Sequence, residues 1–151
     1  MSFKSFFARL GFVATLALCL LTVTGCSSFN RDWRRAAKNP PAADGIEGRW
    51  EGNWLSDANG HNGTLRCLMT KLPDGKYEAR FHAKYMKVLG FKSTAFFDVK
   101  KNDTNHTFTG DADLGVFGLY HYDGEVTGDK FHCTYRCSYD HGDFNMSRPA
   151  K

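Results

Sequence analysis

From about residue 45 onward, hydrophobic and polar residues alternate with a period of two, and turn-forming residues interrupt this alternation at short intervals. Successive side chains of a β-strand point to opposite faces, so the alternation predicts half-buried strands. The interruptions include Asn59-Gly60, Asp74-Gly75 and Gly128-Asp129, which favour tight turns. The predicted strands cover residues 47–55, 63–72, 76–86, 93–101, 105–114, 116–127, 130–139 and 142–148.

Short connections force neighbouring strands to be antiparallel, and eight such strands in sequence predict an up-and-down meander. Closing the meander removes the exposed strand edges. The sequence therefore predicts an all-β domain over residues 45–151, an antiparallel up-and-down β-barrel of about eight strands. No segment of this domain has the pattern of an amphipathic helix of useful length.

The alternation also predicts which side chains point into the barrel. The aromatic residues expected inside, and proposed as ligand-binding residues, are Trp50, Trp54, Phe81, Tyr85, Phe97, Tyr120, Tyr122 and Tyr135. Cys133, Cys137 and Tyr139 are expected on the same inward face as Tyr135. Eight strands enclose a space that side chains can fill or that can hold one small ligand, so a filled core and an apolar pocket both remain open.

The N-terminal residues have a different pattern. Lys4 and Arg9 are followed by an apolar run from Leu10 to Thr24, which is the layout of a secretory signal and is short for a membrane span. Val23-Thr24-Gly25-Cys26 resembles the bacterial lipobox. The resemblance implies cleavage before Cys26 and lipidation of Cys26 with acyl chains such as palmitate, and Ser27 favours the outer membrane. An ordinary secretion signal with an incidental Cys26 is the alternative.

The chain thus divides into a signal peptide (1–25), a lipidated N-terminus with a basic linker (26–44) and the barrel domain (45–151). Phe29 and Trp33 in the linker lie either at the membrane interface or in a solvated segment with a transient helical turn. Pro40 ends any helix there. The cations of the linker are Arg31, Arg34, Arg35 and Lys38.

Gly48-Arg49-Trp50 in the first predicted strand matches the Gly-x-Trp of the calycins, which include lipocalin, fatty-acid-binding and avidin-like barrels. In those folds a late arginine packs over the tryptophan, and Arg148 is placed to do so. The resemblance implies that Trp50 and Arg148 form a closure pair, stabilised by cation–π stacking. The domain is short for a lipocalin and closer to avidin in size.

Cysteine and histidine spacing leaves few candidates for chemistry. Beyond Cys26, the chain has Cys67, Cys133 and Cys137; a disulfide from Cys67 to either of the others, or three buried thiols, both remain open. Cys133 and Cys137 would lie about 13 Å apart on one strand, too far to bridge. A strand also turns His132 and Cys133 to opposite faces, so we predict no metal site and no cofactor.

No nucleophile-elbow, zincin or P-loop motif occurs, and we expect Asp98, Asp111 and Asp113 to lie on a solvent face rather than to form a catalytic carboxylate pair. We therefore predict that the protein is not an enzyme. Lys and Arg number 20 against 16 Asp and Glu, an excess too small to indicate a nucleic-acid partner.

Taken together, these patterns predict a lipoprotein anchored in the outer membrane, with its barrel on the periplasmic side binding a small apolar or amphipathic ligand. The alternative is a filled barrel that serves as a protein-interaction or envelope-structural module. A basic region suits acidic envelope partners or lipid head groups and consists of Lys84, Lys87, Lys92, Lys100 and Lys101.

The lipobox generates a direct prediction. Cys26→Ala is expected to release the protein from membranes, because several acyl chains at ~0.8 kcal/mol per buried methylene hold a protein that one chain holds only marginally. Membrane fractionation and the intact mass of the wild type measure this. Unchanged partitioning of the variant, with no acyl mass on the wild type, would contradict the lipobox assignment.

Overall fold

The computed structural model describes residues 24–40, 45–86 and 88–150. The chain divides into an N-terminal unit and a barrel unit, which are described separately. The predicted signal peptide falls mainly on residues 1–23, which lie outside the described residues, as does Lys87 of the predicted basic region. The backbone of the last lipobox residues, Thr24 to Cys26, begins a helix.

Helix α2 (Thr24–Lys38) occupies the segment that the sequence predicted to be a linker with at most a transient turn. Phe29 and Trp33, four residues apart and therefore on one side of the helix, stack with their ring centroids 5.6 Å apart. The helix ends at Lys38 because a residue that precedes a proline, here Asn39 before Pro40, avoids helical dihedrals. Within the described part of the chain, no helix is long and apolar enough to cross a membrane.

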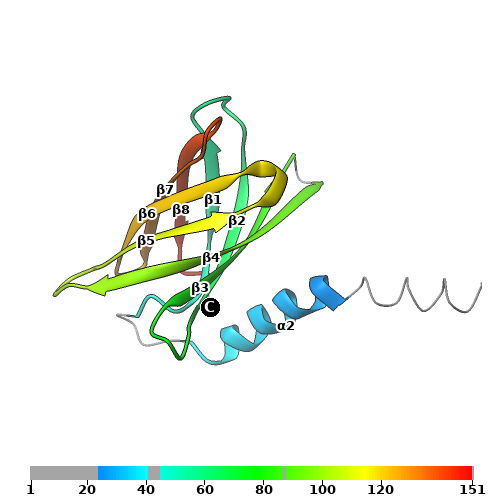
Figure 1. Cartoon of the computed structure of the whole chain (residues 1–151). Helices are drawn as coiled ribbons and strands as arrows, with labels where there is room; N and C mark the ends of the chain where they lie inside the picture. Colours follow the sequence, from blue (N-terminus) through cyan, green and yellow to red (C-terminus); the bar gives the residue numbers. More distant parts are fainter. Residues whose placement is uncertain (1–23, 41–44, 87, 151) are drawn as a thin grey trace, which may run out of the picture. The chain divides into compact units, whose positions relative to one another are not determined.

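The barrel unit is one closed antiparallel β-barrel in which each strand pairs with its neighbours in sequence and β1 pairs with β8 (Figure 1). This confirms the predicted fold class, an up-and-down barrel of the calycin-like kind. The strands are β1 (Gly48–Ser56), β2 (Asn62–Lys71), β3 (Tyr77–Tyr85), β4 (Leu89–Lys101), β5 (His106–Asp113), β6 (Leu119–Thr127), β7 (Lys130–Arg136) and β8 (His141–Ser147).

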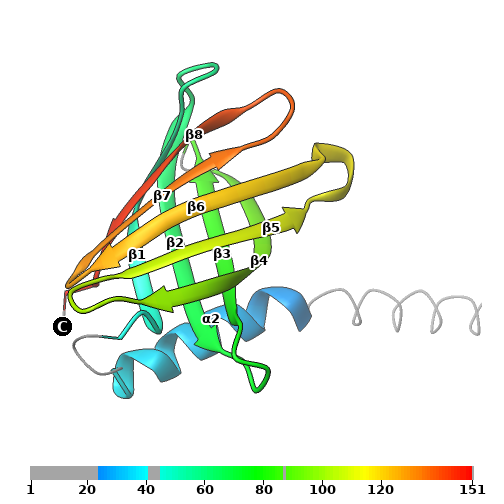
Figure 2. The ribbon, with the colours of Figure 1, turned by 60° about the vertical axis from the view of Figure 1, so that its left-hand side comes forward.

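The strand connections gather at the two ends of the barrel (Figures 1 and 2). We call the end that carries the connections after β1, β3, β5 and β7 the open end, and the opposite end the closed end. The connection after β5 contains a short 3-10 turn, η1 (Gly115–Phe117). Gly115, which begins this turn, and Gly118, which follows it, have φ values of 63° and 74°, in the left-handed region that favours glycine.

Three predicted strand boundaries differ from the structure by three residues or more. Strand β4 begins four residues earlier than predicted, at Leu89, and β6 begins at Leu119 because η1 takes the preceding residues. Strand β7 ends at Arg136, where the amide of Cys137 donates to the carbonyl of Asp140 at 2.7 Å and turns the chain. The prediction that Cys137 and Tyr139 share the inward face of this strand is therefore wrong, and Tyr139 is exposed.

The predicted inward faces of the other strands are confirmed. The interior is built from side chains that alternate along each strand, and those that are fully buried include Trp50, Leu65, Cys67, Met69, Phe97, Phe108, Phe131 and Cys133. Tyr122 also points inward, whereas Phe117 and Leu119 are exposed. Cys67, Cys133 and Cys137 are free thiols, and burial raises the pKa of Cys67 and Cys133, which keeps both protonated and unreactive.

Arg148 and Trp50 close the barrel at the closed end. The guanidinium carbon of Arg148 lies 3.6 Å from the centroid of the Trp50 ring, as the calycin resemblance implied. The same guanidinium donates to the carbonyls of Gly45, Glu47 and Arg49, and the Trp50 Nε1 donates to the carbonyl of Ile46 at 2.9 Å. Burial lowers the pKa of Arg148 to about 10, so this residue remains charged at neutral pH.

Loss of the closure pair is expected to be costly. Trp50→Ala is expected to lower the free energy of unfolding by about 3–5 kcal/mol, because it removes a large, fully buried ring together with its cation–π contact to Arg148. Denaturant melts of the variant measure this loss. Trp54→Ala, at a partly buried position toward the open end, is the control and is expected to cost less; equal losses would contradict the closure role.

Glycines on the inward face let aromatic side chains cross between strands. A methyl group at Gly110 of β5 would lie 2.5 Å from the ring of Phe97 on β4, and one at Gly124 of β6 would lie 2.6 Å from the ring of Phe108 on β5. Carbon atoms in contact lie about 3.5–4.0 Å apart. Each ring therefore occupies the space that a side chain on the neighbouring strand would fill, and the strands coil tightly.

This close approach predicts that Gly110→Ala destabilises the barrel by about 1–3 kcal/mol, the usual cost of overpacking. Gly90→Ala is the matched control, because a methyl group there meets nothing within 4 Å. Thermal and denaturant unfolding measure the stability of the two variants relative to the wild type. If both alanine variants unfold alike, the ring of Phe97 does not depend on the glycine beneath it.

Candidate functional site

The open half of the barrel contains a cavity of about 480 Å³, which we call the open-end cavity. Its walls are mainly aromatic, and several of its lining residues come from β4 and the connections around the open end. The lining residues are Trp54, His61, Leu65, Phe81, Ala83, Tyr85, Leu89, Phe91, Ser93, Leu114, Phe117, Tyr120, Tyr122, Tyr135, Tyr139, Asp140 and Phe144.

A layer of rings forms the bottom of this cavity. Phe81 stacks on Tyr122 with centroids 6.0 Å apart and packs against Phe144 at 5.3 Å. Below this layer Phe97 and Phe108 stack at 4.7 Å and belong to the fully buried core. The barrel is therefore filled toward the closed end and hollow toward the open end. Of the two alternatives left by the sequence, the filled core describes the closed half and the apolar pocket describes the open half.

The aromatic residues proposed from the sequence as ligand-binding fall into two groups. Those that line the open-end cavity are Trp54, Phe81, Tyr85, Tyr120, Tyr122 and Tyr135. Trp50 and Phe97 do not line it, because both are fully buried in the filled half. A period of two predicts the face of a side chain but not its height along the barrel, and the height decides whether it meets packed core or cavity.

Sequence reasoning missed several residues of the wall. Leu89 and Phe91 lie on β4, where the inward period of Ser93, Ala95 and Phe97 continues backward through the region predicted to be a loop. That periodicity was a usable signal. Phe117 and Tyr139 come from connections, where side chains follow no regular period, so the sequence carried no comparable signal for them.

The polar groups of the open-end cavity are mostly neutral hydroxyls. Burial raises the pKa of Tyr120, Tyr122 and Tyr135, so their phenols keep their protons. The carboxylate of Asp140 lies at the wall, where it accepts a hydrogen bond from Ser56 Oγ at 2.6 Å and one from the Tyr135 hydroxyl at 3.4 Å. The cavity thus offers an apolar surface with hydroxyl donors and one carboxylate acceptor.

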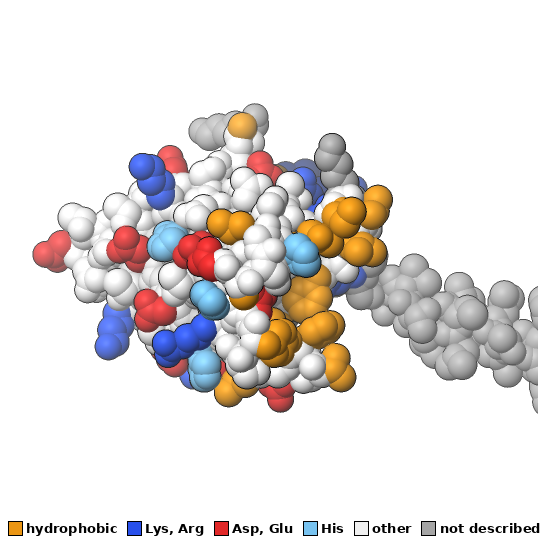
Figure 3. Space-filling view, turned by 90° about the horizontal axis from the view of Figure 1, so that it is seen from above, with side chains coloured by type: hydrophobic (Ala, Val, Ile, Leu, Met, Phe, Trp, Pro, Cys, Tyr) orange, Lys and Arg blue, Asp and Glu red, His pale blue; other side chains and the backbone are white. Residues whose placement is uncertain are grey.

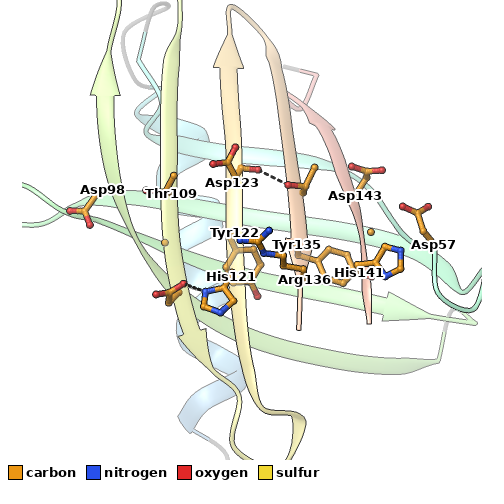
Figure 4. A pocket seen from close by; sticks show the side chains of 14 residues that line it. Asp57, Asp98, Thr109, His121, Tyr122, Asp123, Tyr135, Arg136, His141 and Asp143 are labelled. Atoms are coloured by element: carbon orange, nitrogen blue, oxygen red, sulfur yellow. Dashed lines mark hydrogen bonds and ion pairs between the residues drawn. The ribbon is translucent and has the colours of Figure 1, made fainter. Parts of the chain in front are cut away.

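A second hollow, of about 670 Å³, lies on the outer surface of the barrel (Figure 4). Strand register places a row of outward residues side by side across β4 to β8: Asp98, Thr109, Asp123, Thr134 and Asp143. Figure 4 shows the side chains of Asp98, Thr109, Asp123 and Asp143 spread along the sheet rather than converging on one point. We call this surface the acidic face, and its mainly polar lining lacks the apolar walls of a ligand pocket.

The acidic residues of the outer surface bond to neighbours rather than to one another. Asp111 contacts His121 Nδ1 at 2.6 Å, Asp98 pairs with Lys76 at 3.3 Å, and Asp113 accepts a hydrogen bond from the amide of Gly115 at 2.9 Å. The expected outward placement of Asp98, Asp111 and Asp113 is observed. Among the described residues, no group of three or more His, Cys, Asp or Glu side chains is arranged to hold a metal ion.

Comparison with known proteins adds no guide to function: no family model, curated protein or solved structure matches this chain. A barrel of this kind can carry many unrelated functions, so the fold by itself names no ligand. Function must therefore be inferred from the geometry and chemistry of the open-end cavity.

Proposed function

We propose that this protein is a non-enzymatic binding module that holds one small apolar or amphipathic ligand in the open-end cavity. The cavity itself is the observation that carries the proposal, because a volume of about 480 Å³ falls in the range of ligand pockets. A chain that packs the closed half of its barrel to contact distance has left the other half hollow and lined it with rings.

The lining indicates how such a ligand lies. Its apolar body would contact Phe81, Phe144 and the ring of Tyr122 at the bottom of the cavity. Its polar end would lie near Asp140 and the Tyr135 hydroxyl, where a group that donates a hydrogen bond is favoured and a second carboxylate is repelled. The proposed ligand is therefore an amphipath with a donor group, rather than an anionic one.

The proposal includes the localisation predicted from the sequence. Lipidation at Cys26 would hold the module at the periplasmic side of the outer membrane, supported by the match of Val23-Thr24-Gly25-Cys26 to the lipobox. Ligands of low solubility in water suit a carrier that is kept beside a bilayer. A protein-interaction or envelope-structural module with a filled barrel, the alternative function, gains no support from a half-hollow interior.

The first test is native mass spectrometry of the full chain, purified in detergent, together with an organic extract of the same sample. We expect a stoichiometric adduct that disappears on denaturation and whose mass gives the class of the ligand. Ala83→Phe, which places a ring in the cavity, is expected to reduce binding of the uncharged dye N-phenyl-1-naphthylamine by about tenfold or more, a change of ~1.4 kcal/mol.

Thr109→Phe is the matched control, because it adds the same ring on the acidic face and leaves the cavity unchanged. Its dye binding should equal that of the wild type. A bare polypeptide mass for the wild type, together with equal dye binding by the wild type and Ala83→Phe, would refute the proposed function.

A further inference from the structure

The mouth of the open-end cavity is bordered by exposed hydrophobic side chains. Val116 is 95% and Val88 is 82% exposed, the highest values among the large hydrophobic residues that are exposed. We define the apolar rim as Met86, Val88, Leu89, Val116, Phe117 and Tyr139. Figure 3, which looks onto this end, shows hydrophobic side chains gathered toward one side of the mouth.

The rim is held in place by contacts between its parts. Phe117 meets Phe91 of β4 edge-to-face with centroids 5.6 Å apart, and the Tyr139 hydroxyl donates to the carbonyl of Phe117 at 2.6 Å. These contacts join the connections after β5 and β7 to the start of β4. Side chains as exposed as Val116 and Val88 gain little from packing within the barrel, so an ordered apolar rim indicates a surface outside the barrel that covers it.

The backbone at the rim supports the same conclusion. Met86 has a φ of 50°, and among the described residues it is the one non-glycine residue with positive φ. Such a conformation is costly for a residue with a side chain, and here it projects an exposed methionine. Strain of this kind is retained where a function depends on the position of the side chain.

Charged side chains on the outer surface of the barrel favour contact of the rim with an anionic surface. Lys84 and Lys92 lie on the outer face of the β3–β4 hairpin that carries Val88. On the neighbouring strand β2, Arg66 is paired with Glu51 at 3.8 Å. The acidic face lies on the β4–β8 side of the barrel. Cations beside the β3–β4 part of the rim are attracted to anionic head groups. Val116, Phe117 and Tyr139 lie on connections of the strands that form the acidic face, so the β3–β4 hairpin is the part of the rim suited to contact an anionic surface.

We propose that the apolar rim docks on an anionic lipid surface, so that the ligand enters the cavity directly from the bilayer. The ligand class is then a membrane lipid or a lipid-like amphipath, and this assignment of the ligand rests on the proposed function. The docking of the rim on a lipid surface does not depend on the proposed function. A second copy of the chain is the competing cover, and it differs from a lipid surface in that its contact depends on protein concentration and needs no vesicles.

Hydrogen–deuterium exchange of the full chain in vesicles tests the docking. In vesicles of equimolar phosphatidylglycerol and phosphatidylcholine, peptides that cover residues 88–93 and 114–119 should exchange several-fold more slowly than in phosphatidylcholine alone. The connections at the closed end, residues 72–76 and 102–105, should not change. Because the readout is local, it does not depend on how the N-terminus is anchored.

Matched variants separate rim contact from general effects. The double variant Val88→Ser and Val116→Ser should lose the protection, whereas Phe96→Ser should keep it, because Phe96 is exposed to 48% on the outer face of β4, away from the rim. Lys84→Glu with Lys92→Glu should remove the preference for anionic vesicles. Lys100→Glu, near the closed-end terminus of the same strand, should leave it unchanged.

The outcomes distinguish the proposals. Rim peptides that exchange alike in both kinds of vesicle overturn the docking, and a ligand adduct found in that case means that the cavity loads from solution. Protection that depends on protein concentration without vesicles makes a second copy the cover and also overturns it. If the rim peptides are protected in anionic vesicles and native mass spectrometry finds no ligand adduct, the docking is supported and the proposed function is refuted.

Discussion

The guanidinium of Arg148 lies over the indole of Trp50 and donates hydrogen bonds to the carbonyls of the segment that leads into β1. This contact joins the residue after the last strand to the beginning of the first, at the end of the barrel where the two strands must meet. A half-buried cation requires partners, and here the ring and the carbonyls provide them together. The charge is thus stabilised only when the barrel is closed.

Closure at one end explains why the other end can stay hollow. From Trp50 of the closure pair, a continuous series of ring contacts runs through Phe131 and Phe108 to Phe97. These rings bury apolar surface in the closed half of the barrel. Glycines on the neighbouring strands make room for the larger rings. Since the stability is concentrated in this filled half, the side chains of the open half need not pack to contact distance, and their arrangement can serve a ligand.

The sequence predicted the strands and their inward faces because both follow from a period of two, which a single chain displays directly. It placed Trp50 and Phe97 among the cavity residues because periodicity contains no information about height along the barrel axis. Leu89 and Phe91 were missed because the predicted strand began only at residue 93, although the inward period of β4 continues back through both residues. Tyr139 was assigned inward because the turn after Arg136 depends on a backbone hydrogen bond between Cys137 and Asp140, which no pattern reveals.

The ring layer at the bottom of the cavity has a consequence for how the barrel can load. Phe81, Tyr122 and Phe144 cover the packed core beneath them, so a guest has no route through the closed half. Entry is confined to the mouth, and the mouth is the part of the barrel where the most exposed hydrophobic side chains lie. A ligand of low solubility that passes from a bilayer across the apolar rim avoids transfer through water. Contact with the bilayer also removes the apolar surface of the rim from water, which lowers the free energy of the protein. The hollow interior and the exposed rim are therefore best understood as one device, in which the same end of the barrel admits the ligand and contacts its source.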